Sequence, residues 1–387
     1  MRRGASLAGL KVLAAAAATA GLGGCSLGYY AQSVGGHLEV MRSARPVTDW
    51  VADPATPAAL KERLALAQRM RAFAVRELAL PDNSSYQRFA QLQRGAVVWN
   101  VVAAPELSLT LQTWCFPVMG CVGYRGYFDR AGADALAAEL RAQGLEASVY
   151  GVPAYSTLGW TNWMGGDPLL DTFIRWPEGE LARLIFHELA HQVVYVADDT
   201  AFNESYATAV ERLGAQRWLA QAGPAARAEY AALDARRQDF RALVGATRRE
   251  LEAVYRSALP DEAKRRRKAQ AMEALRSAHR QLKAGPWGGF AGYDGWFERA
   301  NNAALGVQAA YDEWVPAFER LFEAHGRDFA RFHAEVRRLA DMPREARRAR
   351  LLAEPIMAPP AAEAPGAPSK GEGAATPAPR SPAATGG

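Results

Sequence analysis

The chain has 387 residues and a formal net charge of +5, and 49% of its residues are hydrophobic. A chain of this length can bury an ample core, in one large domain or two modest ones. The charge is mild, and the sequence lacks a zinc-ribbon spacing, a Gly-rich phosphate loop and a strip of basic and aromatic residues. Composition and motifs therefore give no case for binding to nucleic acid.

The first 24 residues have the pattern of a secretory signal. A basic start is followed by the apolar run 12–22, which ends before Gly23-Gly24-Cys25. This arrangement is typical of secreted proteins, and the run is too short for a comfortable transmembrane helix. The cysteine after Leu22-Gly23-Gly24 resembles a bacterial lipobox, with plain signal cleavage as the alternative. We therefore expect Cys25 to become the lipidated first residue of the mature chain.

A lipid on Cys25 would fix the location of the protein. Several acyl chains anchor a protein stably to a membrane, and Ser26 gives no obvious signal for retention in the inner membrane. We expect a protein of the bacterial cell envelope, held on the outer membrane and facing the periplasm. In that oxidising compartment Cys115 and Cys121, within the run CFPVMGC, favour a disulfide. The alternative, a thiol metal site, lacks partners nearby.

The part of the chain before residue 175 predicts helices mixed with short strands. Residue patterns predict helices over residues 29–47, 57–80 and 129–143. Runs rich in β-branched and aromatic residues predict strands over residues 96–103 and 146–150, with residues 107–114 as a partner for the first strand. The expected fold class is α+β, predominantly helical, with a small sheet.

The chemistry is expected at His187-Glu188-Leu189-Ala190-His191, which lies within an apolar run. On a helix, His187 and His191 leave the same face and can bind one metal ion. Glu188 projects about 100° round from His187, where it could take a proton from a metal-activated water. Apolar flanks predict a buried helix, and buried histidines need partners or a metal. The alternative is a chance motif on a core helix.

A second helix over residues 202–214, ended by its last residue, a glycine, is expected to carry the third metal ligand. Glu204 in its first turn is the favoured ligand, which leaves Glu211 as a carboxylate that orients a ligand histidine. The reverse assignment stays open, as does a ligand role for Asp198 or Asp199. No His-x-x-Gly-x-x-His continuation follows the motif, which argues against a three-histidine site.

The segment 154–174 (AYSTLGWTNWMGGDPLLDTFI) is rich in Gly, Trp, Ser and Thr, as are many loops that line sites. Tyr155, Ser156, Trp160 and Asp167 are its pocket candidates. Asp167 is also the candidate carboxylate for the α-ammonium group of a substrate. The alternative is a packed loop that carries core tryptophans.

Residues 224–284 predict a long antiparallel helical hairpin, interrupted at Pro260-Asp261. Its basic run 264–268 is expected to be a solvated helix face, with contact to anionic lipid headgroups as the alternative.

The last third of the chain adds three pocket candidates, Asn301, Asn302 and Tyr311. A tyrosine or histidine donor near the metal would stabilise the oxyanion of a tetrahedral intermediate, but for each of the three taken singly the favoured role is capping or core packing. Histidines on polar helices are expected to be solvated: His279, His325 and His333. The Pro, Ala, Gly and Ser content of residues 353–387 predicts a disordered tail.

The runs FHELAHQVVYVADDTAFNESYATAVE and YSTLGWTNWMGGDPLLDTFI resemble a family of bacterial lipoproteins known as predicted aminopeptidases. The resemblance extends from about Cys25 to the 340s. Asn203-Glu204, followed by Ala207, is similar to the third-ligand segment of larger aminopeptidase zincins. The resemblance implies a zincin-like peptidase domain over residues 25–352. In that fold the metal helix packs under a small sheet, whose edge strand holds the substrate backbone.

The leading hypothesis is a zinc-dependent peptidase, an aminopeptidase by resemblance, that hydrolyses peptides in the periplasm. His187, His191 and Glu204 would hold Zn²⁺, and Glu188 would be the general base. One alternative is a non-catalytic, zinc-containing scaffold or binding lipoprotein of the envelope, which the long hairpin motivates. Another is an endopeptidase or amidase at the same site.

Overall fold

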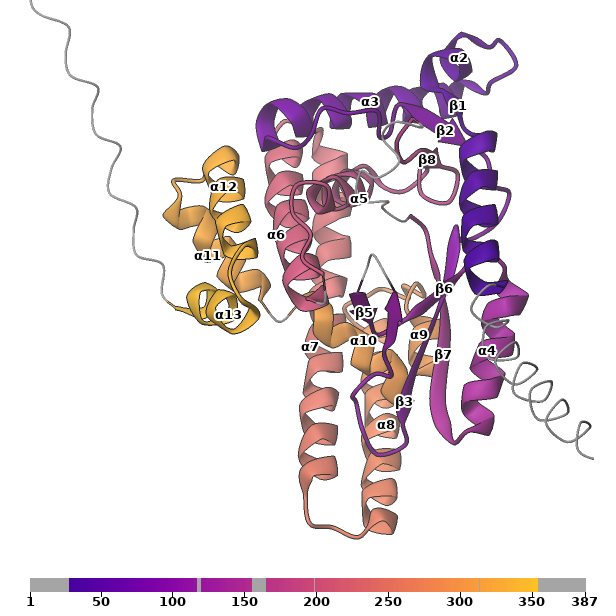
Figure 1. Ribbon diagram of the computed structural model, residues 1–387, viewed down its shortest axis with the longest axis vertical. Helices are drawn as coiled ribbons and strands as arrows, with labels where there is room; N and C mark the ends of the chain where they lie inside the picture. The colour runs from indigo at the N-terminus through magenta and orange to yellow at the C-terminus, as the bar shows by residue number, and fades with distance from the viewer. Residues whose placement is uncertain (1–27, 117–119, 155–164, 198, 313, 354–387) are drawn as a thin grey trace, which may run out of the picture.

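The computed structural model describes residues 28–116, 120–154, 165–197, 199–312 and 314–353 (Figure 1). The signal segment with Cys25, the tail from residue 354, and the pocket candidates Tyr155, Ser156 and Trp160 lie outside the described residues. Among the helices that are described, none combines the length and the apolar character needed to cross a bilayer.

Helices dominate the described chain, and the strands are short. After a first helix over residues 28–43, the elements in chain order are β1 (Arg45–Pro46), α2 (Val47–Ala52), α3 (Ala58–Leu78), β2 (Arg88–Ala90), β3 (Val98–Pro105), β4 (Trp114–Phe116), β5 (Gly120–Val122), β6 (Arg125–Tyr127), α4 (Arg130–Ala142), β7 (Leu145–Val152), β8 (Leu169–Leu170), α5 (Glu178–His191), α6 (Thr200–Leu219), α7 (Pro224–Arg256), α8 (Asp261–Ala284), α9 (Asp294–Arg299), α10 (Asn302–Asp312), α11 (Val315–Ala324), α12 (Phe329–Ala340) and α13 (Arg344–Leu352). The fold class is α+β and mostly helical, as the sequence predicts.

The longest strands of the described chain, β3 and β7, belong to a sheet with the order β6-β3-β7, in which β3 is the central strand. They pair antiparallel over their whole length, from Val98 opposite Val152 to Pro105 opposite Leu145. Alternate residues of a strand point to opposite faces, so β3 packs against α4 on one face and against α10 on the other. Cys115 and Cys121 form a disulfide between the adjacent strands β4 and β5.

The strand predicted over residues 107–114 is wrong. Residues 108–113 are irregular, and β3 pairs with β6 and β7 instead. The alternating leucines of this segment serve two different cores: Leu109 packs with the hairpin cluster, and Leu111 packs beside Ala303 of α10. The alternating leucines therefore pack against two different clusters, and they do not mark the faces of a β-strand.

The largest core is formed by helices. The helix with the histidines, α5, packs against α6, α3 and α7, whereas the larger sheet packs against α4 and α10. The extensive contacts of α5 are thus with helices, and the zincin-like arrangement of this helix under a small sheet stays a prediction. Figure 1 shows α3 lying across the top of α6, with β3, β6 and β7 lower and to the right.

Helix α6 continues to Leu219, so its predicted end at Gly214 is wrong. A Cβ atom at Gly214 would lie 2.7 Å from Cδ1 of Leu78 and 2.9 Å from Cδ2 of Phe186. The glycine therefore permits the close approach of α6 to α3 and α5, and does not end the helix. Glycine in a helix interior costs about 1 kcal/mol relative to alanine, which this close packing offsets.

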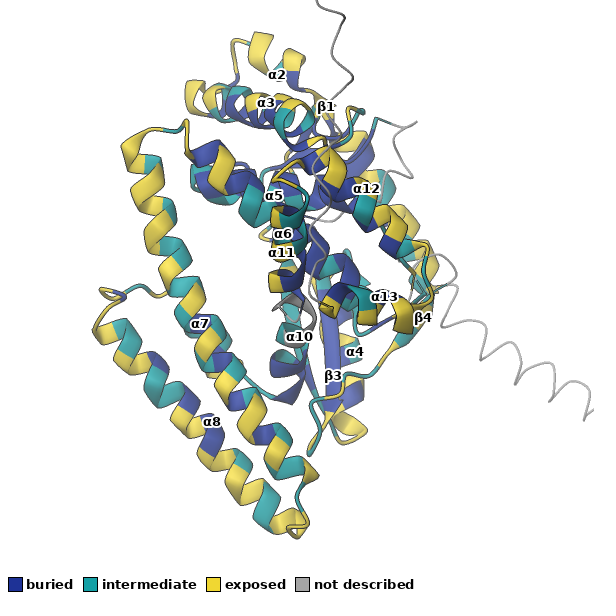
Figure 2. Cartoon of the chain, turned by 90° about the vertical axis from the view of Figure 1, so that its left-hand side faces the viewer, coloured by how far each residue is buried: buried dark blue, intermediate teal, exposed yellow. Residues whose placement is uncertain are grey.

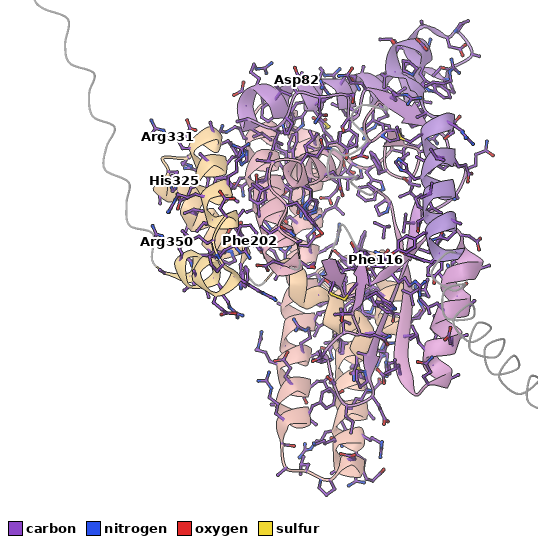
Figure 3. The ribbon with its side chains drawn as sticks, viewed as in Figure 1. Asp82, Phe116, Phe202, His325, Arg331 and Arg350 are labelled. Carbon is purple, nitrogen blue, oxygen red and sulfur yellow. A yellow bond between two sulfur atoms is a disulfide. The ribbon has the colours of Figure 1, made fainter. Side chains whose placement is uncertain are left out.

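The predicted hairpin is present as α7 and α8, and it projects away from the rest of the molecule (Figure 1). Both helices expose residues along most of their length (Figure 2). Between them lies an aromatic cluster with Phe240 and Phe297 in its centre. His279 on α8 is part of this cluster and is 6% exposed, stacked on Phe297 with 4.0 Å between ring centroids. The expectation of a solvated His279 is wrong, while His325, which follows the last residue of α11, is partly exposed (Figure 3).

His333 on α12 is also buried, at 1% exposure, against the prediction. Its Nε2 lies 2.8 Å from the backbone oxygen of Leu78, and its Nδ1 lies 2.8 Å from the hydroxyl of Tyr206. Because a carbonyl oxygen only accepts hydrogen bonds, Nε2 carries the proton and Nδ1 accepts from Tyr206. The neutral imidazole of His333 thus joins α12 to α3 and α6. The polar sequence of α12 gives no sign of these partners, so the burial of His333 could not be predicted from it.

Candidate metal centre

The histidine motif lies in the last two turns of α5. The helix buries Ile185, Phe186 and Leu189 in the main core. Its first turn carries Glu178 and Glu180, which are favourable at the positive end of the helix dipole. The motif is therefore presented by a rigid, well-packed element.

The side chain of Asn203 ties the start of α6 to the connection that precedes it. Its Oδ1 accepts from the backbone N–H of Val196 at 2.8 Å, and its Nδ2 donates to the backbone oxygen of Val196 at 2.7 Å. Asp199 caps α6 by accepting from the N–H of Phe202. These bonds fix the start of α6 and turn Glu204, one residue after Asn203, toward α5.

His187, His191 and Glu204 converge on one point. The two Nε2 atoms lie 3.1 Å apart. Oε2 of Glu204 lies 3.3 Å from Nε2 of His187 and 3.8 Å from Nε2 of His191. Within the described residues, these three form one group whose ligand atoms all lie within 4.8 Å of one another. Two imidazoles and one carboxylate are the donor set of a catalytic zinc site, so the residues fit Zn²⁺.

Glu211 lies behind His187. Its Oε2 is 3.0 Å from Nδ1 of His187, and its Oε1 contacts Nη2 of Arg183. Burial alone would raise the pKa of Glu211, but the Arg183 guanidinium outweighs it and holds the pKa at about 2. An ionised carboxylate at Nδ1 favours a proton there and leaves Nε2 for a metal.

Electrostatics differ between the two histidines. Burial alone would lower the pKa of His187, but Glu204 and Glu211 raise it well above its usual value. Burial lowers the pKa of His191 to about 4, so this imidazole is neutral at pH 7. Burial would raise the pKa of Glu204, yet the two histidines lower it. His191 and Glu204 are thus in the neutral and ionised forms that a metal requires, whereas a metal at Nε2 of His187 would displace a proton from that nitrogen.

Glu188 is 9% exposed. Burial raises the pKa of its carboxyl to about 7, with further contributions from the charges of Glu204 and Asp167. A carboxyl that titrates near neutral pH can both accept and donate a proton in a catalytic cycle.

The family model described as "Putative aminopeptidase" matches residues 28–351. The chain belongs to this family. No curated protein and no solved structure gave a match. In this member of the aminopeptidase family, the matched range includes the histidine helix, α6 and the whole hairpin.

Among the described pocket candidates of this aminopeptidase-family chain, Asp167 contacts Gln192, the residue that follows His191. It is 2% exposed, its N–H donates to Oγ of Ser85, and Nε2 of Gln192 lies 3.4 Å from its Oδ2. Its charge contributes to the raised pKa of Glu188. The side chain of Tyr311 lies outside the described residues.

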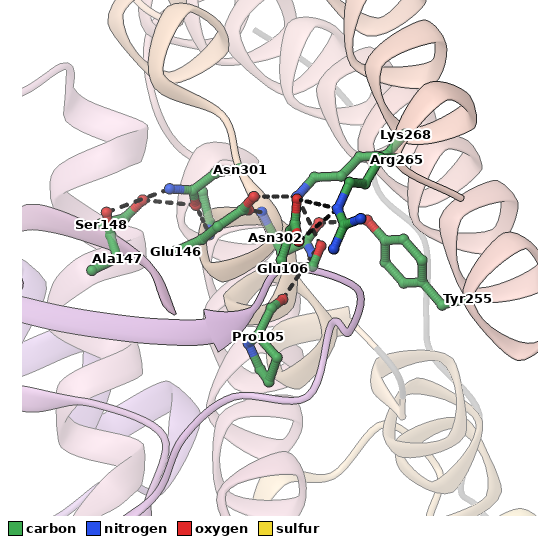
Figure 4. A network of polar contacts seen from close by, with 11 residues as sticks. Pro105, Glu106, Glu146, Ala147, Ser148, Tyr255, Arg265, Lys268, Asn301 and Asn302 are labelled. Carbon is green, nitrogen blue, oxygen red and sulfur yellow. Dashed lines mark hydrogen bonds and ion pairs between the residues drawn. The ribbon is translucent and has the colours of Figure 1, made fainter. Parts of the chain in front are cut away.

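Asn301 and Asn302 lie in a different polar network (Figure 4). Oδ1 of Asn301 accepts from the N–H of Ala304 and from Oγ of Ser148. Nδ2 of Asn302 donates to the backbone oxygens of Pro105 and Glu106. Asn301 therefore caps α10 and joins it to β7, the role favoured for it when taken singly, while Asn302 joins α10 to the end of β3.

The same network holds part of the basic run of α8. Arg265 pairs with Glu106, and Lys268 pairs with Glu146 (Figure 4). These two cations are engaged by the sheet, so they are only in part the solvated face that the sequence predicts.

Asp199 is not turned toward the histidines. Its Oδ2 lies 3.0 Å from Nη2 of Arg347, and the two side chains are 1% and 4% exposed. It also caps α6, which leaves it no role as a ligand. Asp198, the other open candidate, lies outside the described residues.

Sequence reasoning missed Arg183. The signal was available, because Arg183 is a charged residue one turn before His187 within an otherwise apolar stretch. A charge on the buried face of a helix requires a counter-charge, and here that counter-charge is Glu211.

Proposed function

We propose that the protein is a zinc-dependent aminopeptidase that hydrolyses peptides in the periplasm. The observation that carries this proposal is the convergence of His187, His191 and Glu204. A structural zinc site normally fills all four positions with protein ligands, but no fourth His, Cys, Asp or Glu of the described chain joins this group. A group of three protein ligands supports catalysis over a scaffold, and membership of the family supports a peptidase.

When bound by these residues, Zn²⁺ would polarise the peptide carbonyl and lower the pKa of a water molecule. Glu188 follows His187 in the chain, so its carboxylate would take the proton of that water. The protonated carboxyl would then pass the proton to the leaving amine. A pKa raised to about 7 by burial suits both steps. Glu211 would keep the His187 ring oriented throughout.

The preference for N-terminal residues would require a negative group for the substrate α-ammonium. Asp167 is a buried carboxylate whose charge already acts on Glu188, which supports its assignment to this role. The signal and lipobox pattern before Cys25 supports a lipid anchor on the outer membrane, with the domain in the periplasm.

The decisive experiment is a comparison of wild type with Glu188→Gln. Zinc content should stay the same, because Glu188 is not a ligand, while hydrolysis of an aminoacyl amide should fall by about 10²–10⁴-fold. Glu62→Gln, at an exposed position of α3, is the control and should keep full activity. Unchanged hydrolysis in Glu188→Gln would remove Glu188 from its role.

A pair of peptides, one with a free and one with an acetylated N-terminus, tests the type of cleavage. Release of the first residue from the free peptide alone supports an aminopeptidase. Cleavage inside both peptides would identify an endopeptidase. Bound zinc without turnover of any peptide would favour the scaffold.

A further inference from the structure

We propose that Arg183 is a positioning residue of the metal centre, and that helix α7 of the hairpin holds it in place. The inference rests on the proposed zinc site and concerns the residues behind it. Arg183 lies one turn before His187 on α5 and is 7% exposed. A buried guanidinium is costly unless its charge is compensated, so its contacts identify its role.

Arg183 acts on the ligand histidine through Glu211. Nη2 of Arg183 contacts one oxygen of Glu211, and the other oxygen lies 3.0 Å from Nδ1 of His187. The carboxylate cannot rotate without losing one of these contacts. With Nδ1 facing Glu211, Nε2 of His187 faces His191 and Glu204. Arg183 thereby fixes which nitrogen of His187 is presented to a metal.

On its other side Arg183 meets the hairpin. Its Nη1 lies 3.8 Å from Oδ1 of Asp234 on α7, and Nη1 of Arg237 lies 2.9 Å from the same oxygen. Arg237 in turn contacts α5, because its Nη2 lies 2.5 Å from Oε2 of Glu180. Charges of opposite sign thus alternate along a row that runs from α5 to α7 and back to α5, and Glu211 of α6 joins this row to His187.

The two helices are in close contact where this row begins. A Cβ atom at Gly179 of α5 would lie 2.5 Å from Cδ2 of Tyr230 on α7. Only a glycine permits this approach, which keeps Asp234 and Arg237 within reach of α5. The hairpin is therefore more than a projecting appendage, because its first half supports the metal centre from behind.

The test is the zinc affinity of purified variants, measured by competition with a chromophoric chelator. Arg183→Gln should weaken zinc binding by about 10–100-fold, the usual effect of losing an outer-shell partner. Arg183→Lys should recover part of the loss, since it keeps the charge but cannot span two carboxylates. Asp234→Asn should weaken binding by a smaller factor. Arg76→Gln, which breaks an exposed ion pair with Glu77 on α3, is the matched control and should bind like wild type.

A double-variant cycle separates positioning from general damage. Because Arg183 acts through Glu211, Arg183→Gln/Glu211→Gln should bind zinc no more weakly than Glu211→Gln alone. This double variant also leaves no buried unpaired carboxylate, so it serves if Arg183→Gln alone does not fold. The visible spectrum of bound Co²⁺ reports ligand geometry and should change in Arg183→Gln but not in Arg76→Gln.

Two results would overturn the inference. One is wild-type zinc affinity with an unchanged Co²⁺ spectrum in Arg183→Gln. The other is a full additive loss in the double variant. Absence of zinc binding by the wild-type protein would instead reject the proposed function itself, and the inference with it.

Discussion

Oε2 of Glu204 lies 3.3 Å from Nε2 of His187, although the two residues belong to different helices, α6 and α5. The contact exists because Asn203 ties the start of α6 to the backbone of Val196. Glu211 lies two turns further along α6, where Arg183 and Nδ1 of His187 already occupy its oxygens. This geometry favours Glu204 over Glu211 as the third ligand.

Glu204→Ala should weaken zinc binding by more than about 100-fold, since losing a ligand costs more than losing the partner of a ligand. Equilibrium dialysis against Zn²⁺ measures the change, with the exposed Glu62→Ala as control. If Glu204→Ala kept its zinc while Glu211→Ala lost it, the reverse assignment of the two glutamates would be correct.

Acid should destabilise the protein through His333. Burial lowers the pKa of this imidazole from 6.5 to about 4, so between these values the unfolded chain binds a proton that the folded chain does not. Stability attributable to His333 is therefore present at pH 7 and is lost as the pH falls from about 6.5 to 4. The separation of the two pKa values corresponds to about 3 kcal/mol.

Urea unfolding of wild type and His333→Gln at pH 7 and pH 4.5 measures this effect. The variant cannot titrate at this position, so the stability of wild type relative to the variant should decrease at the lower pH. An equal decrease in both proteins would show that other groups cause the acid sensitivity.

Packing at Gly214 gives a third prediction. Gly214→Ala should destabilise the fold by about 1–3 kcal/mol, because its Cβ would overlap Leu78 and Phe186. The matched control is Gly245→Ala on α7, where the nearest atom is Nη1 of the flexible Arg249 at 3.4 Å. This variant should gain up to about 1 kcal/mol from helix propensity. Thermal unfolding of both variants tests the pair, and a stabilised Gly214→Ala would contradict it.

Elements with local signals at both ends could be predicted from the sequence. Helix α4 begins after Asp129, whose side chain accepts from the N–H of Gly132, and it is followed by Gly144 at φ +84°. The hairpin begins with Pro224 at its first position and turns before Asp261. The motif from His187 to His191 is likewise local, since one helix sets its geometry.

Features that depend on residues far apart in the chain could not be predicted from local sequence signals. Gly214 has the sequence signature of a helix end, but Phe186 on a neighbouring helix decides its role. His333 lies on a polar helix, and only its contact with Tyr206 shows why it is buried. The importance of Arg183 depends on Glu211, which lies on the next helix of the chain.

The ion pair between Asp199 and Arg347 also has a consequence for the order of assembly. Asp199 caps the helix that carries Glu204, while Arg347 belongs to α13, the last helix of the described chain. During synthesis α5 and α6 leave the ribosome long before Arg347, which pairs with Asp199. The buried carboxylate of Asp199 lacks its counter-charge until α13 has left the ribosome. The start of α6, the helix that carries Glu204, is therefore completed only when the C-terminal helix α13 docks on it.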